Sequence, residues 1–369
     1  MSAVLHLSRL DARRLHRRAV LLDHPASGID AALAHHGFIQ IDPINVCGRM
    51  HDLILRNRVV AYRESDLMHH LHGPANRPLA ASERRAFEHH LPHSNVLAAL
   101  TFDAWPHLLA AMRGRSRRIS WWSGKMDARQ RRLAKTILEE ISSRGPLCSD
   151  DIDDDRRDHQ GWGVSASLAK TTLHKLFFHG YVLIARRVGT RRFYDLPERI
   201  LPAATLAQPE PSPAETARWV TLLKLRQRRL VTLSRTELQH VADVVQPVAV
   251  VDCPPLYCLR EDLSLLDNPA TDRLQDIRLL APLDPLIYDR RFTRRLWDYD
   301  YTWEVYTPPA RRVRGYYALP VLAGLEFVGH IDPKADRLNK RLVVVNRSIR
   351  RGYRAASAVR ELASFLSVK

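Results

Sequence analysis

The chain has 369 residues, enough for two or three packed domains, and 45% of them are hydrophobic, enough to fill buried cores. It carries 57 lysine and arginine residues against 40 aspartate and glutamate residues, a formal net charge of +17, so we expect a polyanionic partner, and nucleic acid fits best. No segment approaches the ~20 consecutive apolar residues of a membrane span, and the first residues lack the apolar core of a secretory signal, so we expect a cytoplasmic, nucleoid-associated protein.

Nothing in the cysteine or histidine pattern predicts a metal site. Four cysteines are scattered along the chain, at Cys47, Cys148, Cys253 and Cys258. They lack the paired spacing of a zinc site or a disulfide framework, so we expect buried thiols in a reducing compartment. His69 and His72 could share a helix face, but no cysteine or carboxylate completes a site around them, and Gly73-Pro74 ends the segment. We therefore expect no metal ion and no cofactor.

The N-terminal segment predicts two helices and a strand. Apolar residues recur at helical spacing over residues 8–22, opposite several arginines, and a second helix follows at about residues 28–36. Next comes Gly37-Phe38-Ile39-Gln40-Ile41-Asp42-Pro43, an apolar run that holds two short polar side chains and ends at a proline. Because side chains alternate across a strand, Gln40 and Asp42 share one face.

Two interpretations of Gln40 and Asp42 are open. A carboxamide and a carboxylate side by side at the mouth of a pocket could orient and activate one water molecule, or stabilise positive charge that develops on a sugar. Alternatively, the segment is an ordinary strand end at which Asp42 forms an Asx-type turn before Pro43. On these seven residues alone the ordinary strand end is favoured, because short motifs often arise by chance.

The segments that follow predict further helices with basic surfaces. Residues 46–60 are expected to be helical, and Arg49, His51 and Arg56 could contact DNA phosphates or belong to a solvated face. More helices are predicted at residues 65–72, 83–90, 103–112 and 127–142. The basic segment 113–118 is interpreted as a linker suited to contact with a nucleic-acid backbone.

Residues 127–197 predict a winged helix. The expected order is three helices and a two-stranded hairpin, at residues 127–143, from about 149, 165–180, 181–185 and 191–196. The third helix resembles a recognition helix, with five side chains expected on its outer face: Lys170, Thr171, Thr172, His174 and Lys175. The domain could instead be structural, since tandem winged helices often pack together. The acidic run 150–155 would repel phosphates and is expected in a solvated loop.

The rest of the chain predicts a linker, a third winged unit and a β-rich end. Prolines mark residues 197–213 as a linker, and a helix at 216–229 precedes a second helix that Ser234 or Thr236 would cap. Strands are expected at residues 248–252, 256–260, 305–313, 315–322, 326–334 and 341–345, and a helix at 355–366. We therefore predict an α+β fold of tandem winged-helix domains with a C-terminal β-rich sheet, divided at residues 1–126, 127–200 and 214–369.

Four segments together give the chain a family resemblance. They are residues 37–42, Ala281-Pro282-Leu283-Asp284-Pro285-Leu286, the stretch from Arg290-Arg291 to Asp298-Tyr299, and Gly329-His330-Ile331-Asp332-Pro333-Lys334-Ala335-Asp336-Arg337. Over nearly its full length the chain resembles the winged-helix alkylpurine DNA glycosylases of the AlkZ and YcaQ kind. The signature of that family is Gln, an apolar residue, then Gln or Asp. Gln40-Ile41-Asp42 resembles the Asp-bearing YcaQ branch, whereas His330 stands where the family pattern has Arg.

The resemblance implies a C-shaped arrangement of tandem winged helices around DNA and a specific reaction. The expected activity is hydrolysis of the N-glycosidic bond of N7-alkylguanine, including the unhooking of interstrand crosslinks such as those of nitrogen mustards. N7 alkylation already makes the base a good leaving group, so what remains is an oxocarbenium-like sugar and a water molecule to trap it. Asp42 would stabilise the cation or activate the water, and Gln40 would assist. Since no lysine is adjacent, we expect a monofunctional glycosylase.

The expected partner is double-stranded DNA with alkylated purines or crosslinks, bound by a monomer. The residues expected to bind this DNA are Arg49, His51, Arg56, Arg290, Arg291, Arg312, His330, Lys334 and Arg337. The alternative is a winged-helix transcription regulator without catalysis, which explains the charge and the wings but not Gln40 and Asp42 on one strand face. A nuclease is a third possibility, but the chain lacks a carboxylate cluster suited to two metal ions.

Overall fold

The computed structural model describes residues 3–94, 96–159, 165–267 and 276–369. The chain folds into two compact units. Unit 1 combines Met1–Gly37, Ile41–Asp66 and Ala217–Lys369, and unit 2 combines Phe38–Gln40 with Leu67–Thr216. The domain predicted at residues 127–200 lies within unit 2, whereas unit 1 joins the two ends of the chain. Gln40 and Asp42 therefore stand on either side of a point at which the chain passes from one unit to the other.

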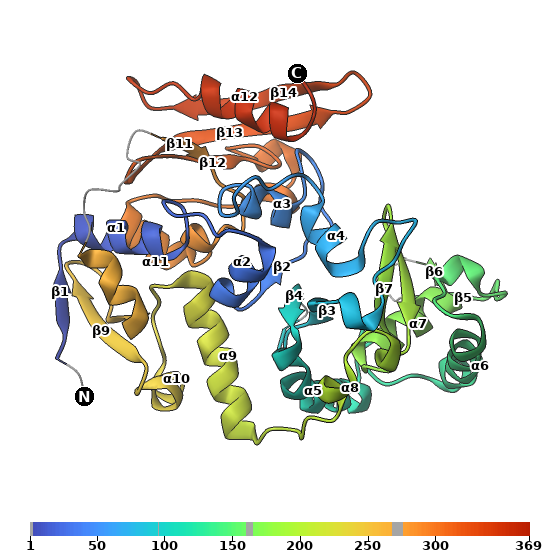
Figure 1. The fold of residues 1–369 in the computed structure, drawn as a ribbon. Coiled ribbons are helices and arrows are strands. Elements are labelled where there is room, and N and C mark those ends of the chain that lie inside the picture. The colour runs from blue at the N-terminus through green and yellow to red at the C-terminus, as the bar shows by residue number, and fades with distance from the viewer. Residues whose placement is uncertain (1–2, 95, 160–164, 268–275) are drawn as a thin grey trace. The chain divides into compact units, whose positions relative to one another are not determined.

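Helices and small sheets are interspersed along the whole chain, which confirms the predicted α+β class (Figure 1). The helices are α1 (Arg9–Ala19), α2 (Ile29–His36), α3 (Met50–Leu55), α4 (Asp66–His72), α5 (Trp105–Arg117), α6 (Ala128–Arg144), α7 (Leu168–Phe178), α8 (Ala203–Leu206), α9 (Pro213–Arg228), α10 (Arg235–Val241), α11 (Arg290–Trp297) and α12 (Ala356–Phe365). No helix among the described residues combines the length and the apolar composition that crossing a membrane requires.

The described residues of unit 1 form two sheets. In the first, β1 (Leu5–Leu7) runs parallel to β9 (Val245–Val250), which pairs antiparallel with β10 (Leu256–Leu259). The second is antiparallel throughout, in the order β11 (Ile277–Leu279), β12 (Leu319–Ala323), β13 (Glu326–Asp336) and β14 (Arg341–Ile349). The first and last segments of the chain thus meet in one unit through backbone hydrogen bonds.

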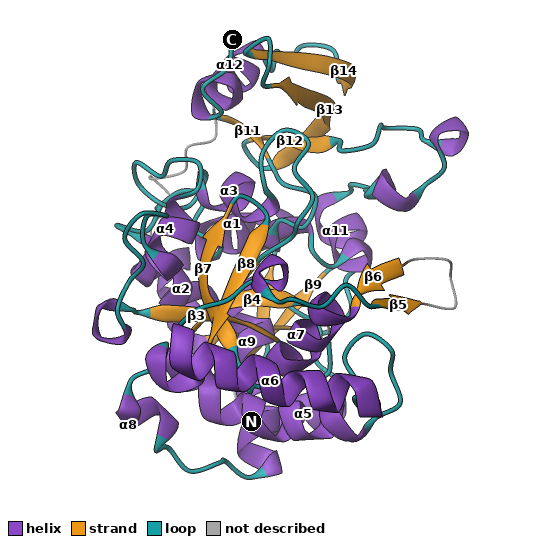
Figure 2. Ribbon diagram, turned by 90° about the vertical axis from the view of Figure 1, so that its right-hand side faces the viewer, coloured by secondary structure: helices purple, strands orange, loops and turns teal. Residues whose placement is uncertain are grey.

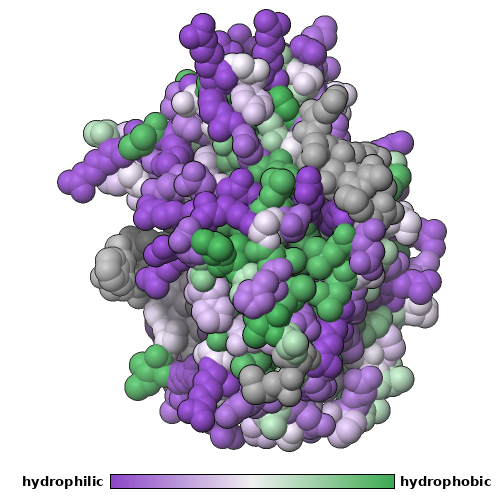
Figure 3. Space-filling view, turned by 90° about the vertical axis from the view of Figure 1, so that its left-hand side faces the viewer, coloured by the Kyte–Doolittle hydropathy of each residue, from purple (hydrophilic) through white to green (hydrophobic). Residues whose placement is uncertain are grey.

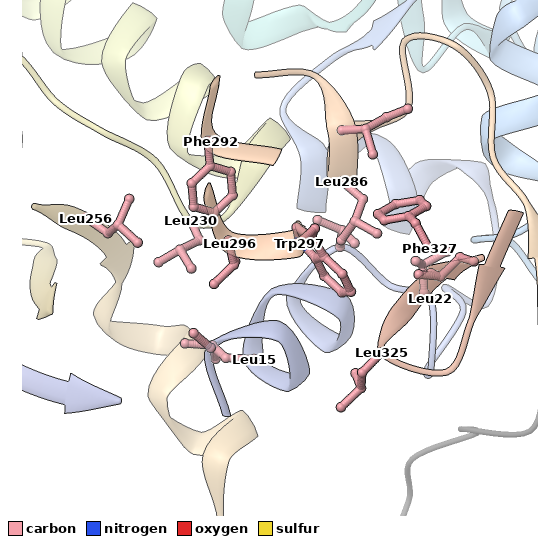
Figure 4. Close-up of a cluster of buried hydrophobic side chains, with 14 of the residues drawn as sticks. Leu15, Leu22, Leu230, Leu256, Leu286, Phe292, Leu296, Trp297, Leu325 and Phe327 are labelled. Atoms are coloured by element: carbon pink, nitrogen blue, oxygen red, sulfur yellow. The ribbon is translucent and has the colours of Figure 1, made fainter. Parts of the chain in front are cut away.

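The second sheet separates two hydrophobic cores because its side chains alternate between faces. Leu322 and Phe327 face a core built with α1 and α11. Leu15, Leu296 and Trp297 contribute to this core, and Figure 4 shows them with Phe327. The opposite face supplies side chains to a second core, in which they pack with those of α3 and α12. Fully burying side chains of this size stabilises a fold by about 1.5–3 kcal/mol each, so these two cores fix the position of the sheet within unit 1.

In the part of unit 2 that the structure describes there are three small sheets. In the largest, β4 (Leu97–Thr101) lies between β2 (Ile39–Gln40) and β3 (Ala86–His90), antiparallel to both. The others are the pair β5 (Arg157–His159) and β6 (Ser165–Ser167) and the hairpin of β7 (Leu183–Val188) and β8 (Arg191–Asp195) (Figure 2). From α6 onward the order is helix, 3₁₀ turn, short strand pair, α7 and hairpin. This order is consistent with the predicted winged helix.

Three predicted elements are wrong. Residues 86–90 form strand β3 rather than a helix. The basic segment 113–118 is not a linker, since α5 continues to Arg117. Residues 305–313 form two 3₁₀ turns, Glu304–Tyr306 and Pro309–Arg311, rather than a strand. The 3₁₀ turns follow from prolines at 308 and 309, which cannot donate backbone hydrogen bonds to a sheet.

The expected outer face of the third winged-helix segment is also wrong. In α7, Thr171, Thr172 and Lys175 are buried, and only Lys170 of the five predicted side chains is exposed. Lys175 Nζ donates to Gln130 Oε1 at 2.9 Å, and Thr171 Oγ1 donates to Asp158 Oδ2 at 3.0 Å. These polar side chains hold α7 against its neighbours inside unit 2, which favours the structural alternative for this helix.

Hydrophilic side chains make up most of the face shown in Figure 3, and a smaller group of hydrophobic side chains gathers near its centre. Among the described residues all four cysteines are free, three of them buried and Cys253 half-buried. Burial raises the pKa of the Cys258 thiol to about 12. The predicted buried thiols are therefore confirmed for three of the four positions.

Candidate active site

The candidate site begins at the end of α2, where Gly37 turns the chain toward Gln40. Gly37 has φ +75°, the left-handed conformation that glycine tolerates best, and its N–H donates to Leu33 O at 2.8 Å. A Cβ here would also lie 2.7 Å from Leu223 Cδ2. Only glycine fits both requirements, so the helix ends at this point and β2 starts two residues later.

Gln40 is held by backbone pairing in unit 2. It is paired with Ala98 of β4 and its side chain is half-buried. Its Oε1 atom is shielded from solvent and accepts no hydrogen bond from any described residue. A buried acceptor without a partner costs roughly 1–3 kcal/mol, and native structures keep few such atoms. Gln40 Oε1 is therefore suited to accept a hydrogen bond from a ligand or a water molecule.

Asp42 is oriented by its own backbone. Its Oδ1 atom accepts a hydrogen bond of 2.9 Å from Ile44 N, across Pro43. This is the Asx-type turn of the ordinary-strand interpretation, and the turn is therefore present. Among the described residues none donates to Oδ2, so the turn fixes the carboxylate and leaves one oxygen for chemistry. Partial burial raises the pKa of Asp42, against the opposing effect of the Ile44 hydrogen bond.

Asp42 lies near one aromatic residue of unit 1. Tyr317 is fully buried, and burial, with the nearby Cys47 and Asp42 side chains, raises its pKa well above the usual value. The Trp303 and Tyr317 rings lie 6.1 Å apart in an edge-to-face arrangement. Trp303 Nε1 is buried and donates to no described residue. Trp303 thus offers an aromatic ring and an unused donor beside Tyr317.

Comparison with known proteins decides the family. The sequence profile of the DNA glycosylase AlkZ-like family matches residues 33–367, which is most of the chain. The chain belongs to the AlkZ-like DNA glycosylase family. The structure is similar to that of Streptomyces sahachiroi DNA glycosylase AlkZ, with a TM-score of 0.61 and 17% sequence identity over 98% of this chain and 96% of that chain.

The family resemblance expected from the sequence is thus confirmed. This AlkZ-like protein is a DNA glycosylase, an enzyme of DNA repair whose substrate is DNA. At 17% identity the likeness to the Streptomyces enzyme concerns the fold. Which residues of this glycosylase act on DNA must be argued from its own side chains.

Of the three DNA-binding candidates near α3, two are half-buried arginines and one is a buried histidine. Arg49 is half-buried at the start of the helix. His51 is fully buried, and burial of this kind argues against a direct phosphate contact. Arg56 Nη2 donates to Leu279 O at 3.0 Å, and burial lowers the pKa of Arg56 to about 10. His51 and Arg56 therefore stabilise unit 1 in this structure.

The α11 arginines divide into an inner and an outer group. Arg290 donates to Ile287 O at 2.7 Å and to Pro282 O at 2.6 Å, and burial lowers its pKa. Arg291 is exposed and lines a cavity of about 570 Å³. The other residues that line this cavity are Arg290, Arg294, Arg295, Asp300, Tyr301, Thr302 and Trp303. Its arginines are suited to phosphate groups.

The remaining candidates lie on β13, at its end, and on the loop before β12. His330 is half-buried, and its Nε2 atom has no hydrogen-bond partner among the described residues. Lys334 is exposed on the same strand, and Arg337 is exposed but pairs with Glu64 at 2.5 Å. Arg312 Nε donates to Thr307 O at 2.8 Å. The fold therefore leaves Lys334 accessible to a ligand and constrains Arg312 and Arg337.

Sequence reasoning did not identify three residues that shape the site: Trp303, Glu304 and Tyr317. Trp303 and Tyr317 are brought together only by folding. Glu304 is buried, and its carboxylate accepts backbone hydrogen bonds from Val313, Arg314 and Gly315. A carboxylate in a Trp-Glu-Val sequence, among aromatic residues, is the one local signal that marks it. No group of three His, Cys, Asp or Glu side chains in the described part of the chain is placed to hold a metal ion.

Proposed function

We propose that this glycosylase hydrolyses the N-glycosidic bond of N7-alkylguanine in double-stranded DNA and unhooks interstrand crosslinks of the nitrogen-mustard type. The observation that carries the proposal is the state of Gln40 and Asp42. Oε1 of Gln40 is a buried acceptor with no partner among the described residues, and Asp42 offers an oriented carboxylate with a free oxygen. Because one residue separates them, chain connectivity keeps their Cα atoms within about 7 Å.

The chemistry follows from the substrate. N7 alkylation makes guanine cationic, so the base departs as a neutral molecule with the electron pair of the C1′–N9 bond and needs little acid assistance. The sugar then carries positive charge at C1′, which a carboxylate stabilises most strongly where water is excluded. Water attacks C1′ and gives up a proton, which Asp42 accepts as general base. Gln40 holds this water molecule through Oε1.

Partial burial of Asp42 favours both of its proposed roles, stabilising the cationic sugar and accepting a proton from water. A half-buried carboxylate is less screened by water than an exposed one, so its field at the sugar is stronger. Its raised pKa also makes it a better proton acceptor once it is ionised. The reaction needs no lysine nucleophile, and we propose a monofunctional hydrolase that acts as a monomer without a cofactor.

The basic cavity beside α11 and the exposed Lys334 on β13 are proposed as DNA-backbone contacts, with Arg291 and Arg49 as further members. Their side chains are exposed or half-buried and positively charged, as phosphate contacts require. His330, Arg312 and Arg337 are proposed to lie at the edge of this surface. Cytoplasmic, nucleoid-associated action belongs to the same proposal.

Single-turnover base release tests the function. One duplex carries a single N7-methylguanine and a second carries a nitrogen-mustard crosslink, and the native protein is compared with Asp42→Asn. We expect release by the native protein and a loss of at least about 100-fold in Asp42→Asn, the usual order for removing a general base. Duplex binding should stay within about twofold, because the basic surface is unchanged.

A matched control carries the same chemical change on an exposed carboxylate, Asp150→Asn, and should release base at the native rate. Equal rates for Asp42→Asn and the native protein would contradict the role of Asp42. Release from neither duplex, together with tight sequence-selective binding, would instead support the non-catalytic regulator.

A further inference from the structure

The segment between α11 and β12 lacks a sheet or an α-helix, yet its backbone is fixed. It runs from Glu304 to Tyr316, and we call it the clamped loop. In Figure 2 the chain leaves α11, passes through two short helical turns and returns to β12. Pro308 and Pro309 restrict its outer half, and Arg312 Nε donates to Thr307 O at 2.8 Å across it. A long connection of this kind is usually either functional or poorly ordered.

Two carboxylates hold its returning half. Glu304 accepts the backbone N–H groups of residues 313, 314 and 315 at 2.8–3.1 Å. Asp332 of β13 accepts those of Tyr316 and Tyr317 at 3.0 and 2.9 Å. Five successive amides thus donate to two side chains. Charge-assisted hydrogen bonds of this type are roughly twice as strong as neutral ones.

The clamp is tightly built. Glu304 is buried; burial would raise its pKa, but the three amide hydrogen bonds outweigh this effect and keep the pKa below its usual value. Gly315 has φ +121°, and a Cβ at this position would lie 2.0 Å from Asp332 Oδ2. Glycine is therefore required for the carboxylate to reach its amides. Burying charge is unfavourable unless it is fully hydrogen-bonded, as it is here.

The rigid backbone presents side chains that are unusual for an exposed loop. Tyr306 is 85% exposed and Val313 is 75% exposed. Arg311 lies between them in sequence, is exposed, and pairs with no described residue. Apolar side chains beside an arginine are what proteins place in a DNA groove, where apolar groups contact sugars or enter between base pairs and arginine meets phosphates.

One end of the clamped loop adjoins the arginine-rich cavity, and the other leads to a tyrosine near Asp42. Trp303 precedes the loop, and Tyr317, whose pKa is raised in part by the charge of Asp42, follows it. The Trp303 ring lies 6.1 Å from Tyr317 on one side and 6.1 Å from Tyr306 on the other. Trp303 also lines the arginine-rich cavity of α11. The arginine-rich cavity and the clamped loop therefore meet at Trp303 within unit 1, and the residue that follows the loop lies near enough to Asp42 to feel its charge.

We propose that the clamped loop is a preformed probe that enters a groove of the damaged duplex and positions the modified nucleotide against Asp42. Tyr306 and Val313 contact bases or sugars beside the lesion, and Arg311 contacts a phosphate. Glu304 and Asp332 are positioning residues that keep the loop in shape. This proposal rests on the proposed function, because it names the duplex around an alkylated guanine as the occupant.

A fluorescent base beside the lesion tests the probe. In the Asp42→Asn background, the protein binds a duplex with 2-aminopurine next to one N7-methylguanine, and the rise in fluorescence reports unstacking. Tyr306→Ala and Val313→Ala should each reduce this rise by at least half. In the otherwise native protein, they should slow single-turnover release at subsaturating enzyme about tenfold. Tyr306→Phe keeps the ring and should behave like the native protein.

Val251→Ala is the matched control for Val313→Ala, since both valines are 75% exposed. If Tyr306→Ala and Val313→Ala both give the fluorescence and rates of Val251→Ala, the probe is ruled out. The fluorescence rise reports DNA binding and not bond cleavage. If the loop substitutions lower this rise but Asp42→Asn releases base at the native rate, only the catalytic role of Asp42 is contradicted. Loss of release in Asp42→Asn with no loop effect would remove only the probe.

Trypsin cleavage tests whether the Glu304 carboxylate holds the clamped loop in shape. Glu304→Gln removes the charge from the carboxylate that holds three amides, and trypsin should then cut after Arg311 or Arg312 several-fold faster than in the native protein. Its fluorescence rise should fall, and its base release at subsaturating enzyme should slow as in Tyr306→Ala, because the loop no longer keeps its shape. A native fluorescence rise despite faster cleavage would show that clamping does not serve DNA binding.

Discussion

The backbone N–H of Ile44 donates a 2.9 Å hydrogen bond to Oδ1 of Asp42, across the intervening Pro43. One local turn thus accounts for both interpretations of the motif. The Asx-type turn that stood as an alternative to catalysis is what fixes the carboxylate in place. A hydrogen bond to a charged acceptor contributes about 1.5–3 kcal/mol to holding that geometry.

Removing the Ile44 donor should therefore slow excision without abolishing it. Ile44→Pro lacks the N–H group, and the Asp42 carboxylate then samples other rotamers. We expect single-turnover release from an N7-methylguanine duplex to fall about tenfold, equivalent to ~1.4 kcal/mol. Ile44→Ala loses the same packing but keeps the donor, and it is the control. Equal rates for the two variants would show that the turn does not orient the carboxylate.

The pH dependence of excision follows from the raised pKa of Asp42. The carboxylate must be ionised to stabilise the cationic sugar, so activity should fall as the pH drops through its pKa. Because partial burial raises this pKa, the acid limb should have its midpoint above the ordinary value of about 3.9. Measuring single-turnover rates from pH 4 to 8, corrected for spontaneous depurination, checks this. A midpoint at or below the ordinary value would contradict the effect of burial.

The raised pKa of Asp42 also affects stability. Ionisation of Asp42 is needed for activity, but it lowers the stability of the fold. A folded-state pKa above the unfolded value gives stability below the unfolded pKa, which is lost as pH rises through the folded pKa. At pH 7 the ionised Asp42 is therefore destabilising. Asp42→Asn should raise the thermal midpoint by about 1–2 °C at pH 7, an effect limited by solvent screening, and should have no stabilising effect at pH 3. A lowered midpoint at pH 7 would contradict it.

Asp284, in the motif that carried part of the family resemblance, has a structural role. Its two oxygens accept 2.8 and 2.6 Å hydrogen bonds from Arg58 Nη1 and Nη2, and both side chains are fully buried. Asp284→Ala leaves an uncompensated buried charge, so we expect a loss of about 3–5 kcal/mol of stability. A large fall of the thermal midpoint checks this, and Arg58→Met with Asp284→Leu should recover much of it. A midpoint unchanged in Asp284→Ala would refute the role.

Structural features that depend on a few neighbouring residues could be predicted from the sequence. The side chain of Ser234 accepts a hydrogen bond from Glu237 N at 3.2 Å, so the predicted cap of α10 is confirmed. The turn between β7 and β8 contains Gly189 with φ +61°, as a tight hairpin requires. The motif of Gln40 and Asp42 is likewise local, and its strand, β2, is correctly placed although shorter than predicted.

Features that depend on residues far apart in the chain could not be predicted from the sequence. Residues 86–90 look too polar for a buried strand, yet Glu88 is almost fully buried because Arg187 Nε and His72 hydrogen-bond to it at 2.7 and 2.5 Å. No periodicity within the segment reveals such partners. The same holds for the site, since the fold and not the sequence brings Tyr317 near Asp42 and Trp303 within 6.1 Å of Tyr317. Polar residues with distant partners are where sequence patterns mislead.

The two groups of α11 arginines should separate binding from stability. Arg291 and Arg295 are exposed and line the arginine-rich cavity, so each substitution to Gln should weaken binding to undamaged duplex regardless of sequence. The slope of log K against log salt should become shallower by about 0.9 for each phosphate group that the variant no longer neutralises. Release at saturating enzyme should stay native, because these residues are not part of the chemistry.

Arg290→Gln is the control for Arg291→Gln and Arg295→Gln, because it should lower stability and leave phosphate binding unchanged. Arg290 donates to two backbone carbonyls, and its guanidinium lies 4.5 Å from the Tyr301 ring centroid. Without these interactions the thermal midpoint should fall by several degrees while the salt slope stays unchanged. Equal salt slopes for Arg291→Gln, Arg295→Gln and the native protein would mean that DNA does not lie along α11, and the phosphate-binding residues would then have to be sought at Lys334 and Arg49.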